Sequence, residues 1–190
     1  TMNISDIEQY AHFFDTVADM KAATNLVTGD YARTLGYYSI GDGGGAIYKI
    51  SDTGTANEKN IIAVGDLYAT LVTGKNLNAK QFGAKGDGVQ DDTTYIQAAL
   101  DALQYSGSLY FPKGYNYLIT DTLTLGADDA CLYSEPKTEY STRITCSTAN
   151  KTIMNITFLS MATALIVQTP LLAALILTVL HLATPRHILI

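Results

Sequence analysis

The stretch FGAKGDGVQDDTTYIQAALDAL, residues 82–103, places three glycines and three aspartates ahead of an apolar-periodic run. The apolar side chains recur at helical spacing, at Tyr95, Ile96, Ala99, Leu100 and Leu103. Asp91, Asp92 and Thr93 come just before them, where helix N-caps belong. The stretch therefore predicts a glycine-rich loop that leads into a helix near residues 91–104.

The loop does not have the spacing of a nucleotide-binding or calcium-binding loop. Lys85 precedes the last two glycines, whereas the lysine of a phosphate loop follows them. A calcium loop would use Asp87, Asp91 and Asp92, but the alternating ligands and the bidentate Glu of an EF-hand are absent. No cofactor, metal or nucleotide site is assigned to these residues.

We interpret the loop as a backbone corner. Gly83, Gly86 and Gly88 permit the left-handed conformations that a tight path needs. Asp91 or Asp92 then caps the helix, because a carboxylate accepts from the free N–H groups of the first turn.

Short β-prone segments lie on both sides of this corner. Upstream, a helix is expected over residues 15–23, with Asp15 or Thr16 as N-cap, and a hairpin over residues 30–50. Two more strands flank Gly65 and Asp66. Further strands are expected at residues 76–81, three within 108–126, and one each at 130–134, 142–147 and 152–158.

The residues NAKQFGAKGDGVQDDTTYIQAALDAL followed by LYFPKGYNYLI, within residues 77–120, resemble the start of pectate-lyase-like right-handed parallel β-helix proteins. That family includes polysaccharide lyases, polygalacturonase-like hydrolases and phage tailspikes. The resemblance implies a helix that caps the open end of the strand stack, where unpaired backbone would otherwise be exposed.

The preceding residues TVADMKAATNLVTGDYARTLGYYSIGDGGGAIYKI are similar to the small module found before the β-helix in phage and prophage tail proteins. The two resemblances together imply a tailspike or tail fibre of the virion tail. The implied partners are a host surface polysaccharide and a phage tail or baseplate protein, and the implied assembly is a homotrimer. A nucleic-acid partner is not expected, because the net charge is −6 and no basic stripe is present.

The expected fold is mainly β, with four consecutive parts. We predict an N-terminal extension (1–14), a small α+β attachment module (15–75), the helix-capped start of a right-handed parallel β-helix (76–158), and an apolar tail (159–190).

The resemblance carries over no catalytic residue. Family hydrolases use paired carboxylates, whereas the lyases use calcium-binding carboxylates and a proton-abstracting base, in middle coils that residues 76–158 do not reach. The clustered charges in the expected coils are Asp128, Asp129, Glu135, Glu139 and Arg143, which we interpret as solvated loop residues.

Other chemistry-bearing residues also favour structural roles. Tyr110, Tyr115 and Tyr117 are interpreted as packing residues instead of sugar platforms. The histidines (His12, His181 and His187) are scattered, and a disulfide between Cys131 and Cys146 is not expected.

Residues 159–183 contain no charged side chain and have the length of a membrane span. Our hypothesis is that the segment after about Phe158 is translated in a shifted frame. A frame that starts on the last base of the Met161 codon reads GGC, which encodes glycine, and further shifted codons encode polar and β-branched residues. The nucleotide sequence across codons 156–165 tests this hypothesis, since an immediate stop in the shifted frame would contradict it.

Two other functions stay open at this point. One is a secreted polysaccharide lyase or glycoside hydrolase of the same superfamily, although the N-terminus lacks the basic and apolar regions of a secretory signal. The other is a membrane-anchored surface protein that uses the apolar tail.

Overall fold

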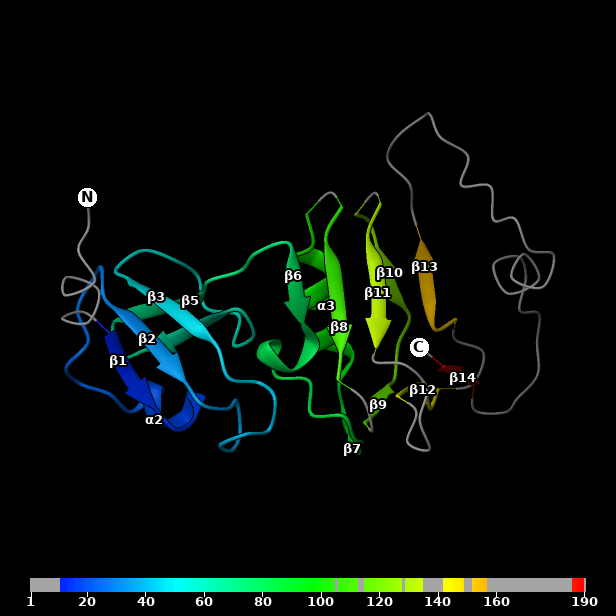
Figure 1. The fold of residues 1–190 in the computed structure, drawn as a ribbon, viewed down its shortest axis with the longest axis horizontal. Helices are drawn as coiled ribbons and strands as arrows, with labels where there is room; N and C mark the ends of the chain where they lie inside the picture. The colour runs from blue at the N-terminus through cyan, green and yellow to red at the C-terminus, as the bar shows by residue number, and fades with distance from the viewer. Residues whose placement is uncertain are drawn as a thin grey trace.

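The computed structural model describes residues 11–104, 106–112, 115–127, 129–134, 142–148, 152–156 and 186–189. Within these ranges a five-stranded sheet comes first and a stack of parallel strands follows it (Figure 1). The predicted order, a small α+β module followed by a right-handed parallel β-helix, is confirmed.

The N-terminal sheet has the strand order β1-β2-β3-β5-β4. Its strands are β1 (Ala11–Phe14), β2 (Tyr31–Thr34), β3 (Ile47–Ser51), β4 (Ile61–Val64) and β5 (Leu67–Leu71). β1 runs parallel to β2, and all other neighbours are antiparallel. Alternate residues of β2 and β3 are buried and exposed, so one face of the sheet packs inward and the other faces solvent.

Helix α2 (Val17–Lys21) covers the inner face of this sheet. It begins with a capping box, in which Thr16 Oγ1 accepts from the Asp19 N–H at 3.2 Å and the Asp19 carboxylate accepts from the Thr16 N–H at 3.0 Å. Val17 and Met20 point into the core. The predicted helix and its Thr16 N-cap are confirmed.

The β-helix has three rungs in the described part of the chain. One sheet contains β6 (Asn76–Asn78), β8 (Ser108–Phe111) and β11 (Cys131–Ser134). The second contains β7 (Asp87–Asp91), β9 (Asn116–Ile119) and β12 (Arg143–Cys146), with β14 (Arg186–Leu189) antiparallel to β12. The third pairs β10 (Leu123–Leu125) with β13 (Met154–Ile156). Apart from the β12–β14 pair, neighbouring strands in these sheets are parallel.

The first rung differs from the next two because a helix replaces its third strand. After β6 comes the 3-10 helix η1 (Ala79–Phe82), then β7, then α3 (Thr93–Asp101), which packs against η1 and β10. α3 therefore covers the end of the stack, as the family resemblance implies.

One apolar cluster connects the two parts. It includes Met20 and Tyr48 in the module, Phe82 of η1, and Leu109 and Ile119 in the rungs. Each fully buried side chain of this size contributes about 1.5–3 kcal/mol. The module thus shares its core with the β-helix, which offsets the thin core that its length alone would provide.

Three local expectations need correction. Residues 11–14, assigned to the N-terminal extension, form β1; the strand is too short to show a period and is defined by its pairing with β2. Residues 87–91, taken as loop, form β7, whose pairing with β9 is irregular and leaves little strand pattern in the sequence. The hairpin of residues 30–50 is present as β2 and β3, but residues 35–46 form a long connection instead of a tight turn.

In the ranges given above, no helix has the length and apolar character needed to cross a bilayer. Within the apolar tail (159–190), residues 159–185 and residue 190 lie outside the described residues, so the frame-shift hypothesis stays a prediction.

Candidate functional site

The glycine-rich segment forms a corner between the first two strands of the β-helix. Gly83, Gly86 and Gly88 all have positive φ, at 100°, 66° and 74°. Gly86 is also tightly enclosed, since a Cβ there would lie 2.8 Å from Cβ of Tyr115. The backbone-corner interpretation is confirmed.

Asp92 anchors this corner from inside the protein. Its side chain is fully buried, and its two oxygens accept from the N–H groups of Lys85 at 2.8 Å and Gly86 at 2.9 Å. Burial raises the pKa of Asp92, against the lowering effect of these bonds. Asp92 holds the N-cap position of α3 but makes no capping bond; Asp91 accepts from the Thr93 N–H at 3.0 Å instead.

Asp87 closes a tight turn at the outer side of the corner. Its Oδ1 accepts from Gln90 N–H at 2.8 Å and Val89 N–H at 2.9 Å, and Lys85 Nζ lies 3.0 Å from its Oδ2. These bonds lower the pKa of Asp87 to about 2, and the bond from the Gln90 N–H has the largest effect. Asp87, Asp91 and Asp92 thus face different donors, and no group of three acidic, His or Cys side chains in the described ranges is arranged to hold a metal.

The cap on the strand stack depends on a side-chain amide. Gln97 of α3 donates from Nε2 to the Thr124 carbonyl at 2.9 Å, and its Oε1 accepts from the Thr124 N–H at 2.8 Å. Thr124 lies in β10, and among the described residues β10 has a strand on its other side alone, namely β13. The amide of Gln97 therefore supplies the donor and the acceptor that a neighbouring strand would have supplied.

A buried lysine lies at the junction of module and β-helix. Lys80 is 5% exposed; its Nζ donates to the Lys85 carbonyl at 3.0 Å and lies 3.5 Å from the centre of the Tyr115 ring. Burial lowers the pKa of Lys80, and nearby aspartates oppose this effect. Its ammonium thus has a structural use, in a carbonyl bond and a cation–π contact.

Three hydrogen bonds join the long β2–β3 connection to the first rung. Tyr38 Oη donates to the Gly83 carbonyl at 2.7 Å. Asn78 Nδ2 donates to the Gly43 carbonyl at 3.0 Å, and Gln81 Nε2 to the Gly45 carbonyl at 2.9 Å. The module is therefore fixed to the capped end of the β-helix.

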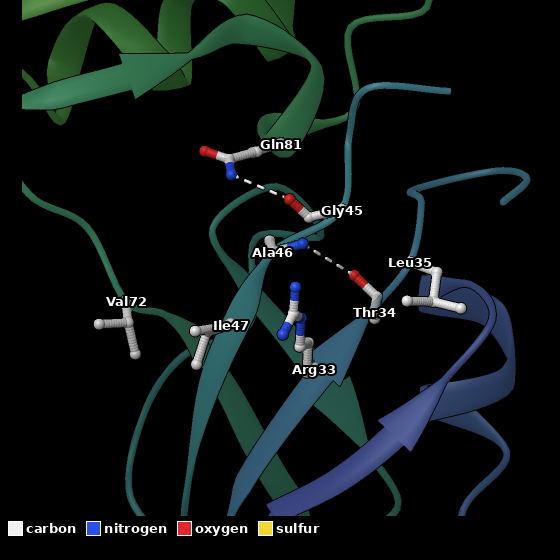
Figure 2. A pocket seen from close by; sticks show the side chains of 8 residues that line it. All are labelled: Arg33, Thr34, Leu35, Gly45, Ala46, Ile47, Val72 and Gln81. Atoms are coloured by element: carbon white, nitrogen blue, oxygen red, sulfur yellow. Dashed lines mark hydrogen bonds between the residues drawn. The ribbon is translucent and has the colours of Figure 1, made fainter. Parts of the chain in front are cut away.

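A cavity of about 450 Å³ opens at the same junction, above the outer face of the sheet (Figure 2). Arg33, Ile47 and Val72 line its floor and Gln81 its upper side. No carboxylate in the described part of the chain pairs with Arg33. The cavity therefore combines the Arg33 cation with apolar side chains, a combination that the sequence did not reveal.

The clustered charges considered above as catalytic candidates are not assembled into a site in the described ranges. Asp129 is exposed in a turn with φ 54°, and Arg143 is exposed at the start of β12. No ion pair joins them. Asp128, Glu135 and Glu139 lie outside the described residues.

Tyr115 and Tyr117 fit the packing interpretation, and Tyr110 is partly buried and packs against a ring of the next rung. Tyr117 is fully buried, 5.3 Å from the Phe111 ring, and Tyr115 is half-buried under Lys80. Tyr110 pairs in register with Tyr133 of the next rung, with ring centroids 5.2 Å apart, and Tyr133 is 41% exposed. The sequence missed this outer pair because only the rung register brings the two rings together.

The remaining candidates are separate from one another. Cys131 is exposed, Cys146 is buried, and both are free thiols. His12 lies 3.1 Å from the buried carboxylate of Asp30 and ties β1 to the turn before β2. His181 and the side chain of His187 lie outside the described residues.

Curated relatives share sequence with part of this chain. Mannuronan C5-epimerase AlgE3 of Azotobacter vinelandii is 31% identical over 144 residues, which cover 64% of this chain and 8% of that protein. Alginate lyase 7 of the same organism is 56% identical over 39 residues, covering 20% of this chain and 5% of the relative. The chain thus spans less than a tenth of these relatives.

A solved structure shares the fold. The tailspike protein gp49 of Acinetobacter baumannii bacteriophage Fri1, a capsular polysaccharide depolymerase, superposes with a TM-score of 0.54 at 23% identity. The match covers 65% of this chain and 23% of the tailspike. Identity at this level shows a shared fold, namely the parallel β-helix of a tailspike.

A sequence model of the family "Rhamnogalacturonase A/epimerase, pectate lyase-like" matches residues 76–172. The match begins at the first residue of β6, where the β-helix starts. It also runs past Phe158, into the segment that we attribute to a frame shift. The match covers half of the chain, and together with the capped strand stack it shows that this protein belongs to the pectate lyase-like family of parallel β-helix proteins.

Proposed function

We propose that this chain is the N-terminal part of a phage or prophage tailspike or tail fibre. The module would serve attachment to the virion through a tail or baseplate protein. The rungs would lead into further coils that bind, and in the full-length protein cleave, a host surface polysaccharide. The assembly would be a homotrimer on the virion tail, without a nucleic-acid partner.

The closed end of the strand stack is the observation that carries this proposal. Because α3 lies on β10 and Gln97 bonds both backbone groups of Thr124, we expect the stack to extend away from the module. A polysaccharide surface that runs along the coils therefore lies on the far side of the cap. The module, held by Tyr38, Asn78 and Gln81, is left free to bind a different partner.

The likeness to the bacteriophage Fri1 tailspike supports the fold, and the printed activity of that protein supports polysaccharide as the ligand class. We expect this chain to be non-catalytic by itself. The aspartates of the corner hold backbone groups, and Asp129 and Arg143 form no acid–base pair.

Two experiments test the proposal. Gold-labelled antibody raised against the module should decorate the tails of phage particles released from the source bacterium; labelling of the particle-free secreted fraction alone would contradict it. This chain should leave a panel of capsular polysaccharides at full length, whereas the product of the whole gene should shorten at least one of them.

The second candidate is a secreted polysaccharide lyase or glycoside hydrolase. The similarity to an epimerase and a lyase named for alginate-type polymers favours it. A secretory signal encoded upstream in the gene, together with cleavage of alginate by the secreted protein, would support this candidate over the tailspike.

A further inference from the structure

The outer face of the N-terminal sheet presents large apolar side chains to solvent in the part of the chain that the structure describes. The register places Arg33 between Phe13 and Ile47. Val72 continues this row, since its N–H donates to the Ile47 carbonyl at 2.8 Å. Phe13, Ile47 and Val72 are 67%, 46% and 51% exposed, and Tyr31 in the next row is 41% exposed. The apolar patch is therefore on the order of 400 Å², a size that marks interaction sites on protein surfaces.

The charge of this face is opposite to that of the whole chain. None of the five strands contains an acidic residue, whereas Arg33 and Lys49 are exposed on the outer face. Neither cation has an ion-pair partner in the described ranges. The net charge of the protein is nevertheless −6. A segment that covers the apolar patch must therefore bring acidic groups to these two cations.

Residues 1–10 lie outside the described residues, continue directly into β1 and have this chemistry. Their sequence, TMNISDIEQY, contains Asp6 and Glu8 and no lysine, arginine or histidine. Alternate side chains of an extended segment share one side, which puts Ile4 on the same side as both carboxylates. Residues 159–183 also lie outside the described residues, but they have no charged side chain and so cannot complement the cations.

The end of β1 at which residues 1–10 join lies at the cationic face. The register puts Lys49 in the same row as Ala11, two strands away. Neighbouring strands are about 4.8 Å apart, so Lys49 is about 10 Å from Ala11, a distance that an extended chain covers in about three residues. Glu8 precedes Ala11 by three positions and therefore reaches Lys49. Asp6 comes two positions earlier and reaches Arg33 in the adjacent row.

We propose that residues 1–10 lie across the outer face of the sheet in the same chain. Asp6 and Glu8 then approach Arg33 and Lys49, and Ile4 contacts the apolar patch. The patch is covered within one molecule, so no second copy is needed to remove it from water. This inference concerns the chain itself and does not depend on the proposed virion role.

A fluorescent probe on the full chain tests the proposal. The chain contains no tryptophan, so Ile4→Trp places a single indole in the segment. Acrylamide should quench this indole at least twofold more weakly than in a chain that also carries Arg33→Glu and Lys49→Glu. The matched control Arg143→Glu, at an exposed residue of β12, should leave the quenching unchanged. Circular dichroism and the unfolding midpoint establish that each variant is folded.

A charge swap and a dye complete the test. Asp6→Arg with Glu8→Arg, added to the chain that carries Arg33→Glu and Lys49→Glu, should restore at least half of the lost protection. In the chain without the probe, Asp6→Arg with Glu8→Arg should raise the binding of the apolar dye ANS at least twofold, because the patch is then uncovered. Asp66→Arg, in the exposed β4–β5 turn, should not change dye binding.

The contrary outcomes identify other occupants of the face. A probe that is equally accessible in every variant, together with unchanged dye binding, overturns the proposal. If Arg33→Glu then abolishes binding of alginate, the face binds an acidic polysaccharide instead. Protection that appears only as the protein concentration and the mass by sedimentation rise together shows that a second copy covers the face, and it also overturns the proposal.

Discussion

Replacing Gln97 with Leu should destabilise the chain by about 1–2 kcal/mol. The substitution keeps the side-chain size and the helix propensity but removes both bonds to Thr124, at 2.9 and 2.8 Å. A hydrogen bond contributes a net of about 0.5–1.5 kcal/mol, so the two bonds together contribute about 1–3 kcal/mol. The lower part of this range applies because Thr124 is exposed, and water therefore replaces part of what the amide supplied.

The measurement is urea unfolding of the full chain followed by far-UV circular dichroism, with a thermal scan beside it. A loss of this size lowers the Tm of a chain of this length by about 2–8 °C. Asp101→Ala is the matched control, because it removes only the partner that Gln97 has within the helix and should cost about 0.5 kcal/mol or less.

Gln97→Glu makes the test sharper. The carboxylate still accepts from the Thr124 N–H but cannot donate to the carbonyl, and it faces Asp101 four residues on. We expect a loss comparable to that of Gln97→Leu, partly recovered when Asp101 is also removed. If Gln97→Leu unfolds at the wild-type urea midpoint with an unchanged slope, the amide does not replace a strand and our account of the cap is wrong.

Three further predictions concern the corner and the core. Gly86→Ala should cost well over 1 kcal/mol of stability, because φ at Gly86 is 66° and the new Cβ would lie 2.8 Å from Tyr115. The control Gly65→Ala, at φ 57° with open space around it, should cost only about 1 kcal/mol, and equal losses in urea unfolding would contradict the steric argument. Tyr117→Phe should leave stability unchanged or raise it, because its buried hydroxyl has no hydrogen-bond partner among the described residues. Tyr37→Phe should cost about 0.5–1.5 kcal/mol through the lost bond to the Glu58 carbonyl, and the reverse order in thermal scans would contradict this account. The pKa of Asp87 is lowered to about 2, so its contribution is present above the unfolded-state pKa of about 4 and is lost as the pH falls toward 2. Asp87→Asn keeps the Oδ1 acceptor and should reduce the loss of stability between pH 5 and 2, as followed by urea midpoints. The raised pKa of Asp92 acts with the opposite sign. If the dependence of the urea midpoint on pH is unchanged in Asp87→Asn, the assignment to Asp87 is wrong.

Local chemistry was enough to predict the elements that begin the β-helix. Glycine is needed wherever φ is positive, which marked Gly83, Gly86 and Gly88 as a corner. Helical spacing of apolar residues marked α3, and short β-prone runs marked β8 to β13. These signals lie within a few residues of each other, so a sequence carries them without reference to the rest of the fold.

The functional contacts are different, because they join residues that the sequence keeps far apart. Gln97 and Thr124 meet only because α3 lies on β10, and Tyr110 meets Tyr133 through the register of successive rungs. The four residues of β1 carry no periodic signal, and a partner strand alone defines them.

The sequence by itself therefore determined the corner, the capping helix and the succession of short strands, because backbone conformation and hydrophobic period are local properties. Only the tertiary structure decided that a side-chain amide closes the stack and that Lys80 is buried at the junction. It also decided that Arg33 lies beside Phe13 and Ile47 on the outer face of the sheet. Those facts depend on which segments pack together, and packing is a property of the whole chain.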